Sequence, residues 1–518
     1  MTVTRLARAA AIVAIFGLVS RLLGFAREIV LAASFGATGA TDAYVNSLLI
    51  VNAVAAILLY TLVTLIIPVF QRERARNGSE SAWRLVTALA VWVGILLIGL
   101  SSVVAIWPEA FAALFHLDPT REAQTAELIR IMAPALALQG FSAIFTAMLQ
   151  IHGRFAGPAA VGVAFNFGII VGVLVGRSSI GIEAAAWGVV IGALLQVLLQ
   201  LPQFWRLLRE SGSTRPVFSH PGLGAVALLA VPVVGASILQ QINSFTDKLF
   251  ASSLQPGRVS ALSFANALGQ APRVALLLPL LTPLFPLIAR LISEGRDGEA
   301  LGAFKRVAGL LALVSIPMMV YLAVYSQEIS QLAFGRGKCG PGCVDQISAP
   351  LTFYALCMWP AFTAALLNRT LSAANKQRDI LWTTIITVVL TIAFDIILLG
   401  PMEQSGLALA STIGVYTNAI TMLWCLRRHF PELSVTDLGR RDVRMLVAGA
   451  AAAVTALALN IVLPTDDLSN VSMILPLSIK VLLSGAVYIV LARLLAGPEL
   501  SEGRRAVGAL VARKKTAR

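Results

Sequence analysis

The chain has 518 residues, of which 58% are hydrophobic and only 13% are charged, and its mean hydropathy is +0.83. This composition excludes an ordinary soluble globular protein and predicts an all-α polytopic membrane protein. The net charge of +14 raises the question of a nucleic-acid partner, which the placement of the basic residues answers below.

Fourteen apolar runs are long enough to cross about 30 Å of hydrocarbon. The first run is longer than a signal-peptide core and lacks a small-residue cleavage site before the next, so we take it as the first transmembrane helix. In chain order the runs occupy residues 7–35, 41–70, 82–107, 122–151, 156–176, 181–205, 222–252, 257–290, 301–326, 346–373, 379–400, 404–426, 443–463 and 473–496.

The basic residues are distributed unevenly between the two sides of this arrangement. Of the 40 Lys and Arg residues, 28 lie in the two tails, in loops on the same side as the N-terminus or at the adjoining ends of the spans, and five lie in or next to loops on the opposite side. This asymmetry predicts that both termini are cytoplasmic. The excess of positive charge is therefore a topology signal, and we expect no nucleic-acid partner.

An internal repeat relates the two halves of the chain. Gly39 and Gly257 each stand 29 residues before a proline, Pro68 and Pro286, near the end of a span. Six helices per half make the repeat parallel and predict two pseudo-symmetric six-helix lobes around a central cavity. The expected parts are an N-lobe at 1–210, a C-lobe at 211–430, two extra helices at 431–500 and a basic cytoplasmic tail at 501–518.

The first span carries charge at a depth where lipid disfavours it. Arg21, Arg27 and Glu28 lie around Gly24 within the apolar run, and intramembrane charges normally face a protein interior or a wet cavity. Arg21 and Glu28 are seven residues apart and share a helix face, whereas Arg27 points about 100° away. Since guanidinium groups bind phosphate oxygens bidentately, this strip suits a lipid-linked phosphate or pyrophosphate.

Other charges inside the predicted spans are sparse. Arg273 is a further candidate for binding an anionic substrate, as is Asp42, although Asp42 together with Thr41 is also suited to capping its own helix. Lys480 lies near a helix end and is expected to extend toward the membrane surface. The full set comprises Asp42, Arg130, Asp247, Lys248, Arg273, Arg369, Asp395 and Lys480.

Oxygen ligands in the second half suggest a cation site. Asp247 and Asp395 are single acids in apolar helices, Thr391 lies one turn before Asp395, and Ser411 and Thr412 lie in the next span. Such groups are able to coordinate Na⁺ or to relay H⁺. We expect one of these as the coupling ion and no other cofactor.

The cysteines and histidines give no sign of an enzyme or a metal site. Cys339 and Cys343 flank a Gly-Pro-Gly turn in a predicted outer loop, where either a small disulfide or two unpaired thiols fit. The four histidines fall in loops or at helix ends, and the sequence contains no phosphate-binding glycine loop. These features favour a transporter that ATP does not drive directly.

Several motifs resemble one family. They are Ser20-Arg21-Leu22-Leu23-Gly24-Phe25-Ala26-Arg27-Glu28, Phe35-Gly36-Ala37, Ala40-Thr41-Asp42-Ala43-Tyr44, Pro68-Val69-Phe70, Gly153-Arg154-Phe155-Ala156-Gly157-Pro158-Ala159 with Asn166, Trp187 to Gly192, Gln241-Ile242-Asn243 with Asp247, and Phe353-Tyr354-Ala355-Leu356. Together they resemble the MurJ (MviN) family of the MOP flippase superfamily, and they span most of the chain.

The resemblance implies a flippase of the bacterial inner membrane. Such proteins move the undecaprenyl-pyrophosphate-linked peptidoglycan precursor, lipid II, to the outer leaflet by alternating access, and so serve cell-wall biogenesis and cell shape. It also implies that Arg21, Arg27 and Asp42 are functionally required, that helices in 431–500 form a groove for the lipid tail, and that Asp247 and Asp395 lie near a cation site. The partners implied are the lipid-linked glycan, membrane lipids and cell-wall synthesis proteins.

The sequence departs from the family pattern at three charged positions. Ala55 and Tyr60 stand where typical members have an arginine and a glutamate, and Ala267 stands where another arginine is usual, with Arg273 about two turns further on. These departures leave other lipid-linked oligosaccharides open as substrates. Two further alternatives are a cation-coupled exporter of amphipathic small molecules and a non-transporting membrane scaffold.

Overall fold

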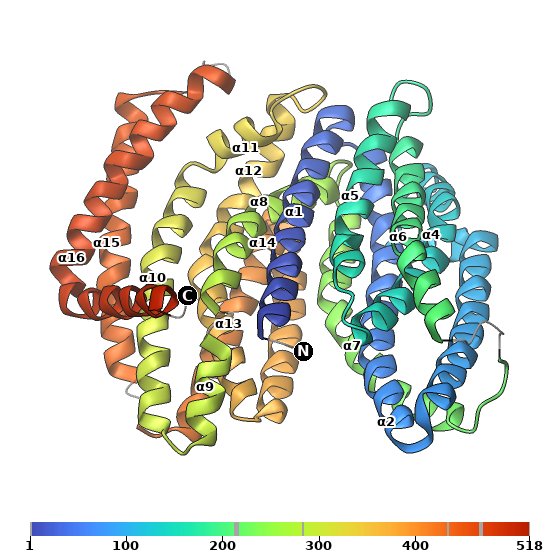
Figure 1. Cartoon of the computed structure of the whole chain (residues 1–518). Helices are drawn as coiled ribbons and strands as arrows, with labels where there is room; N and C mark the ends of the chain where they lie inside the picture. Colours follow the sequence, from blue (N-terminus) through green and yellow to red (C-terminus); the bar gives the residue numbers. More distant parts are fainter. Residues whose placement is uncertain (1–2, 212–216, 282–283, 433–434, 466–469, 517–518) are drawn as a thin grey trace. The chain divides into compact units, whose positions relative to one another are not determined.

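A computed structural model describes residues 3–211, 217–281, 284–432, 435–465 and 470–516 of the chain (Figure 1). Nearly all of these residues are helical, and no strand occurs among them. Two compact units are present: Met1–Ser260 with Gly337–Cys339, and Ala261–Arg336 with Gly340–Arg518. The all-α membrane fold predicted from composition is confirmed.

The first unit contains α1 to α7 and a short 3₁₀ helix. Their bounds are α1 Val3–Phe35, α2 Gly39–Ile106, α3 Pro108–Ala112, η1 Ala113–Phe115, α4 Pro119–Ile151, α5 Ala156–Gly176, α6 Glu183–Ser211 and α7 Leu223–Ser252. The second unit contains nearly all of α8 and the helices that follow it. These are α8 Arg258–Leu281, α9 Leu284–Ser293, α10 Asp297–Val324, α11 Ser326–Phe334, α12 Pro341–Leu356, α13 Met358–Ala373, α14 Gln377–His429, α15 Val435–Val462 and α16 Asn470–Thr516.

Two of these helices each contain two predicted spans. In α2 the backbone breaks at Gly78, with φ 85° and ψ 174°, a conformation that glycine adopts readily. In α14 the break is at Glu403, with φ 49° and ψ −132°, two residues after Pro401. Both breaks fall between predicted spans, so the chain reverses there, as the sequence predicts.

The number of spans is not settled by helix length and hydropathy. Among the described residues, eight helices pass such a test, or nine if α12 and α13, bent by 46°, form one span. That number treats α2 and α14 as one helix each. All fourteen predicted runs fall on helical segments, and fourteen crossings remain a prediction.

The core of the first unit forms where the two arms of α2 meet α4. Phe70 and Trp83 lie on opposite sides of the bend at Gly78 and pack edge to face, with ring centroids 5.8 Å apart. Met148 of α4 is completely buried in the same apolar cluster. Because about 25 cal/mol is gained per Å² of apolar surface removed from water, these contacts hold the bend of α2 against the C-terminal part of α4.

Close glycine packing joins α5 to α6. A Cβ at Gly168 would stand 2.3 Å from the Cα of Gly192, and one at Gly172 would stand 2.5 Å from the Cα of Gly188. Each helix thus presents two glycines four residues apart, the pattern that lets membrane helices touch backbone to backbone. No larger residue fits this interface.

The position of α7 differs from the lobe division made from the sequence, which assigns this helix to the second lobe. Here α7 belongs to the first unit. Val226 packs with Val69 and Leu85 of α2, and the Ser252 hydroxyl donates to the Phe115 carbonyl at 2.7 Å. Repeat position alone could not predict these contacts, because they depend on side chains of α2 and η1.

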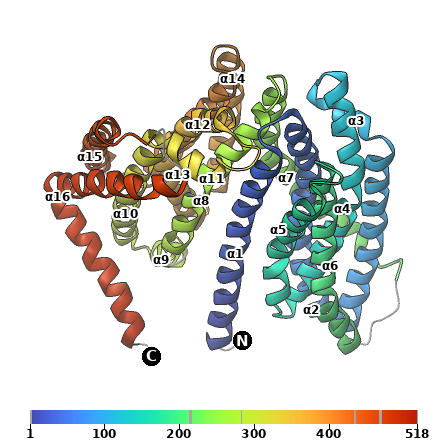
Figure 2. The same ribbon diagram turned by 90° about the horizontal axis from the view of Figure 1, so that it is seen from above.

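In the second unit, α10, α13 and α14 share an apolar core that includes Phe304, Phe362 and Leu426. The last two helices, α15 and α16, lie side by side (Figures 1 and 2) and both contact α10. We call α15 and α16 the C-terminal helix pair. It corresponds to the two helices that the sequence places outside the repeat.

Candidate functional site

The charged strip predicted on the first span lies on α1, and its two arginines have different surroundings. Arg27 forms an ion pair with Glu28, and its Nη1 donates to Asn166 Oδ1 at 3.2 Å. Arg21 is exposed, and within the described part of the chain we find no hydrogen bond or ion pair to it. Arg27 is therefore held in place, whereas Arg21 is available to a ligand.

Asn166 of α5 fixes the surroundings of Arg27. Its amide nitrogen donates to the carbonyls of Ser20 at 3.1 Å and Gly162 at 2.9 Å, which leaves its oxygen to accept from Arg27. Asn166 also lies beside Gly24, with Nδ2 3.6 Å from where a Cβ would stand. Gly24 thus lies next to the Asn166 side chain, and its predicted contact with substrate stays a prediction.

Two further polar side chains join this group from α2 and α7. Tyr44 is 1% exposed and interacts electrostatically with Arg27 and Glu28. Lys248, half-buried on α7, interacts electrostatically with Glu28, Arg27 and Asp247. We call Arg27, Glu28, Tyr44, Asn166 and Lys248 the α1 polar cluster.

Asp42 does not cap its own helix. The N-cap of α2 is Thr38, and the Asp42 carboxylate instead accepts from Gly257 N at 2.6 Å and from Ser260 N at 2.7 Å. These amides belong to the first turn of α8, whose unpaired N–H groups need acceptors. At 2% exposure, Asp42 is a capping residue supplied by another helix, and its predicted contact with substrate remains untested.

Arg273 lies on α8 in the second unit and is half-buried. It interacts electrostatically with Cys357, which stands at the bend between α12 and α13. Arg130, by contrast, is exposed and pairs with Glu109 at 2.9 Å, so it is not one of the buried charges that the sequence suggests. Arg130 lies on the part of α4 that faces α3, which supplies Glu109.

The second-unit candidates for a cation site are gathered on α14. Thr391 and Asp395 are 1% and 0% exposed, and Thr412 is 3% exposed. A Cβ at Gly414 would stand 2.1 Å from the Thr391 hydroxyl, so the two arms of α14 meet at this point, and Ser411 lies on the second arm. Asp247 belongs to the first unit. No group of three or more His, Cys, Asp or Glu side chains able to hold a metal occurs among the described residues.

Comparison with known proteins places this geometry in context. A family model described as "Lipid II flippase MurJ" matches residues 31–479. A Rhizobium meliloti (strain 1021) protein named "Probable lipid II flippase MurJ" is 28% identical over 423 residues, covering 78% of each chain. The chain belongs to the lipid II flippase MurJ family.

Two solved structures agree with this assignment at the level of the fold. One, "Lipid II flippase MurJ, inward closed conformation", has a TM-score of 0.77 at 18% identity and covers 93% of this chain and 98% of its own. The other is an inward-facing multidrug resistance MATE family transporter of the MOP superfamily, with a TM-score of 0.66 at 13% identity, covering 79% of this chain and 94% of its own. The fold of this MurJ family member is thus that of the MOP superfamily.

Three residues depart from the MurJ family pattern of charged positions, and they differ in burial. Ala55 is buried at 8% exposure and Tyr60 is 47% exposed, and Ala267 is half-buried. None of these side chains carries charge. Among the described residues, the candidate cations are Arg21, Arg27 and Lys248 in the first unit and Arg273 in the second.

In the structure Cys339 and Cys343 are disulfide-bonded. The neighbouring residue Lys338 donates its backbone N–H to the Ala33 carbonyl at 2.9 Å. Gly337, with φ 63°, stands so close that a Cβ would be 2.1 Å from the same carbonyl. The loop segment before the disulfide is thereby attached to the C-terminal end of α1.

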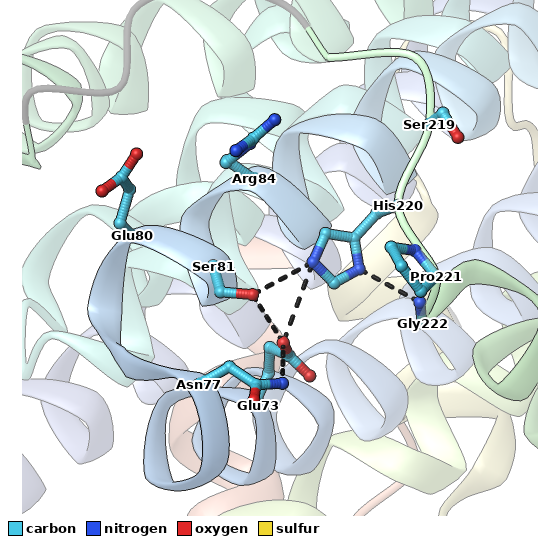
Figure 3. A pocket seen from close by; sticks show the side chains of 9 residues that line it. All are labelled: Glu73, Asn77, Glu80, Ser81, Arg84, Ser219, His220, Pro221 and Gly222. Atoms are coloured by element: carbon cyan, nitrogen blue, oxygen red, sulfur yellow. Dashed lines mark hydrogen bonds and ion pairs between the residues drawn. The ribbon is translucent and has the colours of Figure 1, made fainter.

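A polar pocket of about 470 Å³ lies where the bend of α2 meets the segment before α7 (Figure 3). His220 Nδ1 accepts from Gly222 N at 3.1 Å, and Nε2 is 3.1 Å from the Ser81 hydroxyl, which donates to Glu73 at 2.6 Å. Hydrogen bonds from Ser81 and Asn77 keep the pKa of Glu73, outside the predicted spans, below its usual value.

This arrangement joins Ser81 to His220 but does not make a nucleophile. In a Ser-His-acid triad a carboxylate orients Nδ1 of the histidine, whereas here a backbone amide does. The Phe218 carbonyl also accepts from the Trp92 indole at 2.8 Å. The pocket residues therefore anchor the start of α7 to α2.

Three members of the α1 polar cluster are not assigned to a site by the sequence analysis: Tyr44, Asn166 and Lys248. Asn166 stands alone between two phenylalanines in an apolar span, and a single carboxamide at such depth is a signal that could have been used. Lys248 was recognised as a buried charge but not assigned to a site, because its proximity to Glu28 depends on where α7 packs.

Proposed function

We propose that this chain translocates lipid II from the cytoplasmic to the outer leaflet by alternating access. The observation that carries the proposal is the state of the two arginines on α1: Arg27 is held by Glu28 and Asn166, and Arg21 is exposed without a partner among the described residues. Membership of the MurJ family, whose members carry the name lipid II flippase, supports the same substrate.

The two arginines would act in sequence on the pyrophosphate. Arg21 meets the headgroup first, because no bond to another described residue has to break. Arg27 is preorganised and adds a second charged contact as the headgroup moves along α1. Hydrogen bonds to charged groups contribute about 1.5–3 kcal/mol each, so two contacts suffice to hold an anion transiently without trapping it.

Two other cations compensate for the uncharged residues at Ala55 and Ala267. Lys248 lies within electrostatic reach of Glu28 in the first unit, and Arg273 is half-buried in the second. In the proposed mechanism each is a candidate contact for the anionic headgroup within its own unit. This keeps the cationic character of the site although two family arginines are absent.

The C-terminal helix pair would receive the undecaprenyl tail. Its outward side chains are strongly apolar, and Ile461, Leu482 and Leu494 are 84%, 72% and 75% exposed. A polyprenyl chain prefers such a surface to water or to charged side chains. The headgroup and the tail are thus assigned to different parts of the chain.

Cation coupling would use the buried oxygens of α14. Asp395 and Thr391 are almost completely buried, and the Thr412 hydroxyl donates to the Phe353 carbonyl at 2.8 Å, which orients its lone pairs. Na⁺ and H⁺ are both suited to such a set, with Ser411 of the same helix as a further ligand. Binding of the ion would favour one conformation over the other.

The chain is a multi-pass membrane protein, and its family consists of transporters. We further propose that it works in the bacterial inner membrane with both termini in the cytoplasm, as the distribution of Lys and Arg predicts. Cell-wall synthesis proteins on the outer face are the expected partners, since they consume the exposed precursor. A drug-exporter function has no specific support, because the MATE resemblance concerns the fold alone.

The direct test is complementation of a bacterium depleted of its own lipid II flippase. Arg21→Ala and Arg27→Ala should each abolish rescue and reduce exposure of the precursor on the outer face, while the protein still inserts in the membrane. Arg130→Ala is the matched control, because Arg130 is an exposed arginine of the same unit. Normal rescue by both α1 variants would refute the proposal.

A further inference from the structure

Lys480 on α16 is completely buried, at 0% exposure. It does not extend to the membrane surface as its place near a helix end suggests. A buried ammonium group inside an apolar helix pair is costly unless other groups neutralise and hydrogen-bond it. The neighbours of Lys480 therefore indicate what the residue does.

Four groups surround the Lys480 ammonium. It donates to Asn460 Oδ1 at 2.8 Å and to the Thr465 hydroxyl at 3.3 Å, and it lies 3.7 Å from Glu328 Oε1. The Tyr325 ring lies below it, with its centroid 5.9 Å from Nζ. Thr465 also donates to Glu328 at 3.2 Å, so the charges are enclosed by their own partners.

These groups come from every element around α16. Asn460 belongs to α15, Thr465 follows it, Glu328 is on α11, and Tyr325 joins α10 to α11. The ammonium donates two hydrogen bonds, to Asn460 and Thr465, and the Glu328 carboxylate balances its charge at 3.7 Å. The Lys480 ammonium group is therefore satisfied by its neighbours, and its role is to fix the positions of the helices that carry them.

A polar stripe extends the same face of α16. Lys480, Ser484 and Tyr488 recur every four residues and are 0%, 0% and 2% exposed, so they lie on one side of the helix. Ser484 lies against Tyr321 of α10 and against Tyr325, which follows α10. An apolar interface would allow α16 to rotate or slide, whereas the hydrogen bonds and the ion pair of Lys480 select one register.

A second contact ties α16 to α11 nearer its start. Asn470 Oδ1 accepts from Gln331 at 3.0 Å, and Asn470 Nδ2 donates to the Gly335 carbonyl at 2.7 Å. Asn470 and Lys480 are ten residues apart, about 15 Å along the helix. Two separated attachments fix both the position and the rotation of α16 relative to α11.

We propose that Lys480 and Glu328 form a charge clamp, and that Lys480 is a positioning residue that holds the C-terminal helix pair in the register needed to carry the lipid tail. This inference rests on the proposed function. In this proposal the helix pair contacts the polyprenyl tail of the substrate and does not contact the headgroup. The effect of losing the clamp should therefore depend on tail length.

The experiment uses the full-length chain in liposomes with two substrates that share the lipid II headgroup, one with an undecaprenyl tail and one with a short polyprenyl tail. The double variant Lys480→Met/Glu328→Gln leaves no uncompensated buried charge, so its thermal stability should stay near that of the unchanged protein. We expect its rate to fall about tenfold with the long tail and to change little with the short one. Single variants serve only to show the loss of stability from an unpaired charge.

Arg493→Met is the matched control, because it removes a cation from an exposed position of the same helix. Equal losses with both tails, or a full long-tail rate in the double variant, would overturn the inference. A readout independent of transport is the distance between spin labels at Ser478→Cys and Arg336→Cys, both exposed positions. If the double variant shows the same distance distribution as the protein without these two substitutions, the clamp is also overturned. If the protein without substitutions flips neither substrate, the proposed function is refuted instead.

Discussion

Asn166 determines where the guanidinium group of Arg27 lies. It does so because its amide nitrogen is already used by the carbonyls of Ser20 and Gly162, so its oxygen has one direction left. A residue with no charge of its own thus orients the charge of another. This is the finest detail of the site, and it depends on the contact between α1 and α5.

Replacing Asn166 with alanine should weaken the site in a measurable way. The lost hydrogen bond to a charged group corresponds to about 1.5–3 kcal/mol, and we expect both lower thermal stability and weaker rescue of a flippase-depleted strain. Asn77→Ala is the matched control, since Asn77 is an exposed asparagine bonded to Glu73. Rescue by Asn166→Ala equal to that by the control would contradict the role assigned to Asn166.

Asp42 offers a second prediction, which separates capping from substrate binding. Asp42→Asn keeps an acceptor oxygen for the first turn of α8, whereas Asp42→Ala leaves the amides of Gly257 and Ser260 unpaired and should destabilise the protein by about 1–2 kcal/mol. If capping is the role, Asn should retain more thermal stability and more rescue than Ala. An Asn variant that is as stable as the unchanged protein yet as inactive as Ala would show that the negative charge itself is required.

The sequence predicted the residue types of the site better than their contacts. Arg21 and Arg27 were identified because charge in an apolar span is conspicuous. The pairing of Arg27 with Glu28 was not, since helical spacing places neighbouring residues about 100° apart and only long side chains bridge that angle. Lys480 was misjudged for a similar reason, because its partners on α11 and α15 are distant in sequence.

At the scale of elements, backbone contact between α5 and α6 is the most exacting feature of the first unit. Gly168 and Gly172 oppose Gly192 and Gly188 at separations that leave no room for a methyl group. The interface must open or shift if either partner acquires a side chain. Its stability is therefore sensitive to the smallest substitution.

Gly168→Ala should lower the melting temperature, through an overpacking penalty of about 1–3 kcal/mol. Gly99→Ala in α2 is the matched control, because nothing lies within 4 Å of a Cβ at that position and alanine favours a helix. The two melting temperatures are measured in the same detergent. Equal or higher stability of Gly168→Ala would mean that the two helices are not in backbone contact.

The helices themselves were predictable, and their grouping was only partly so. Apolar length predicted where the helical segments lie, and the breaks at Gly78 and Glu403 fall in the predicted loops. The placement of α7 with the first unit depends on Val226 meeting Val69 and Leu85, which periodicity cannot reveal. Local composition predicts where a helix forms, whereas the shapes of the packed side chains decide which helices contact each other.

At the scale of the whole molecule, the headgroup and the tail of the substrate are proposed to contact different parts of the chain. The cations of α1, α7 and α8 are assigned to the pyrophosphate, and the C-terminal helix pair is assigned to the tail. Family membership could be anticipated from the motif around Arg21 to Glu28, because charged residues at fixed spacing in an apolar helix are rare. The identity of the coupling ion could not, since hydroxyl and carboxylate oxygens accept both Na⁺ and H⁺.

The central claim is that the α1 guanidinium groups receive an anionic headgroup on its way across the membrane. The measurement that tests it most directly is the rate at which the purified chain flips lipid II in liposomes, compared among the unchanged protein, Arg21→Ala and Arg130→Ala. We predict a rate at least about tenfold lower for Arg21→Ala, from the loss of one charged contact, and an unchanged rate for Arg130→Ala. Equal rates for all three proteins would contradict the claim.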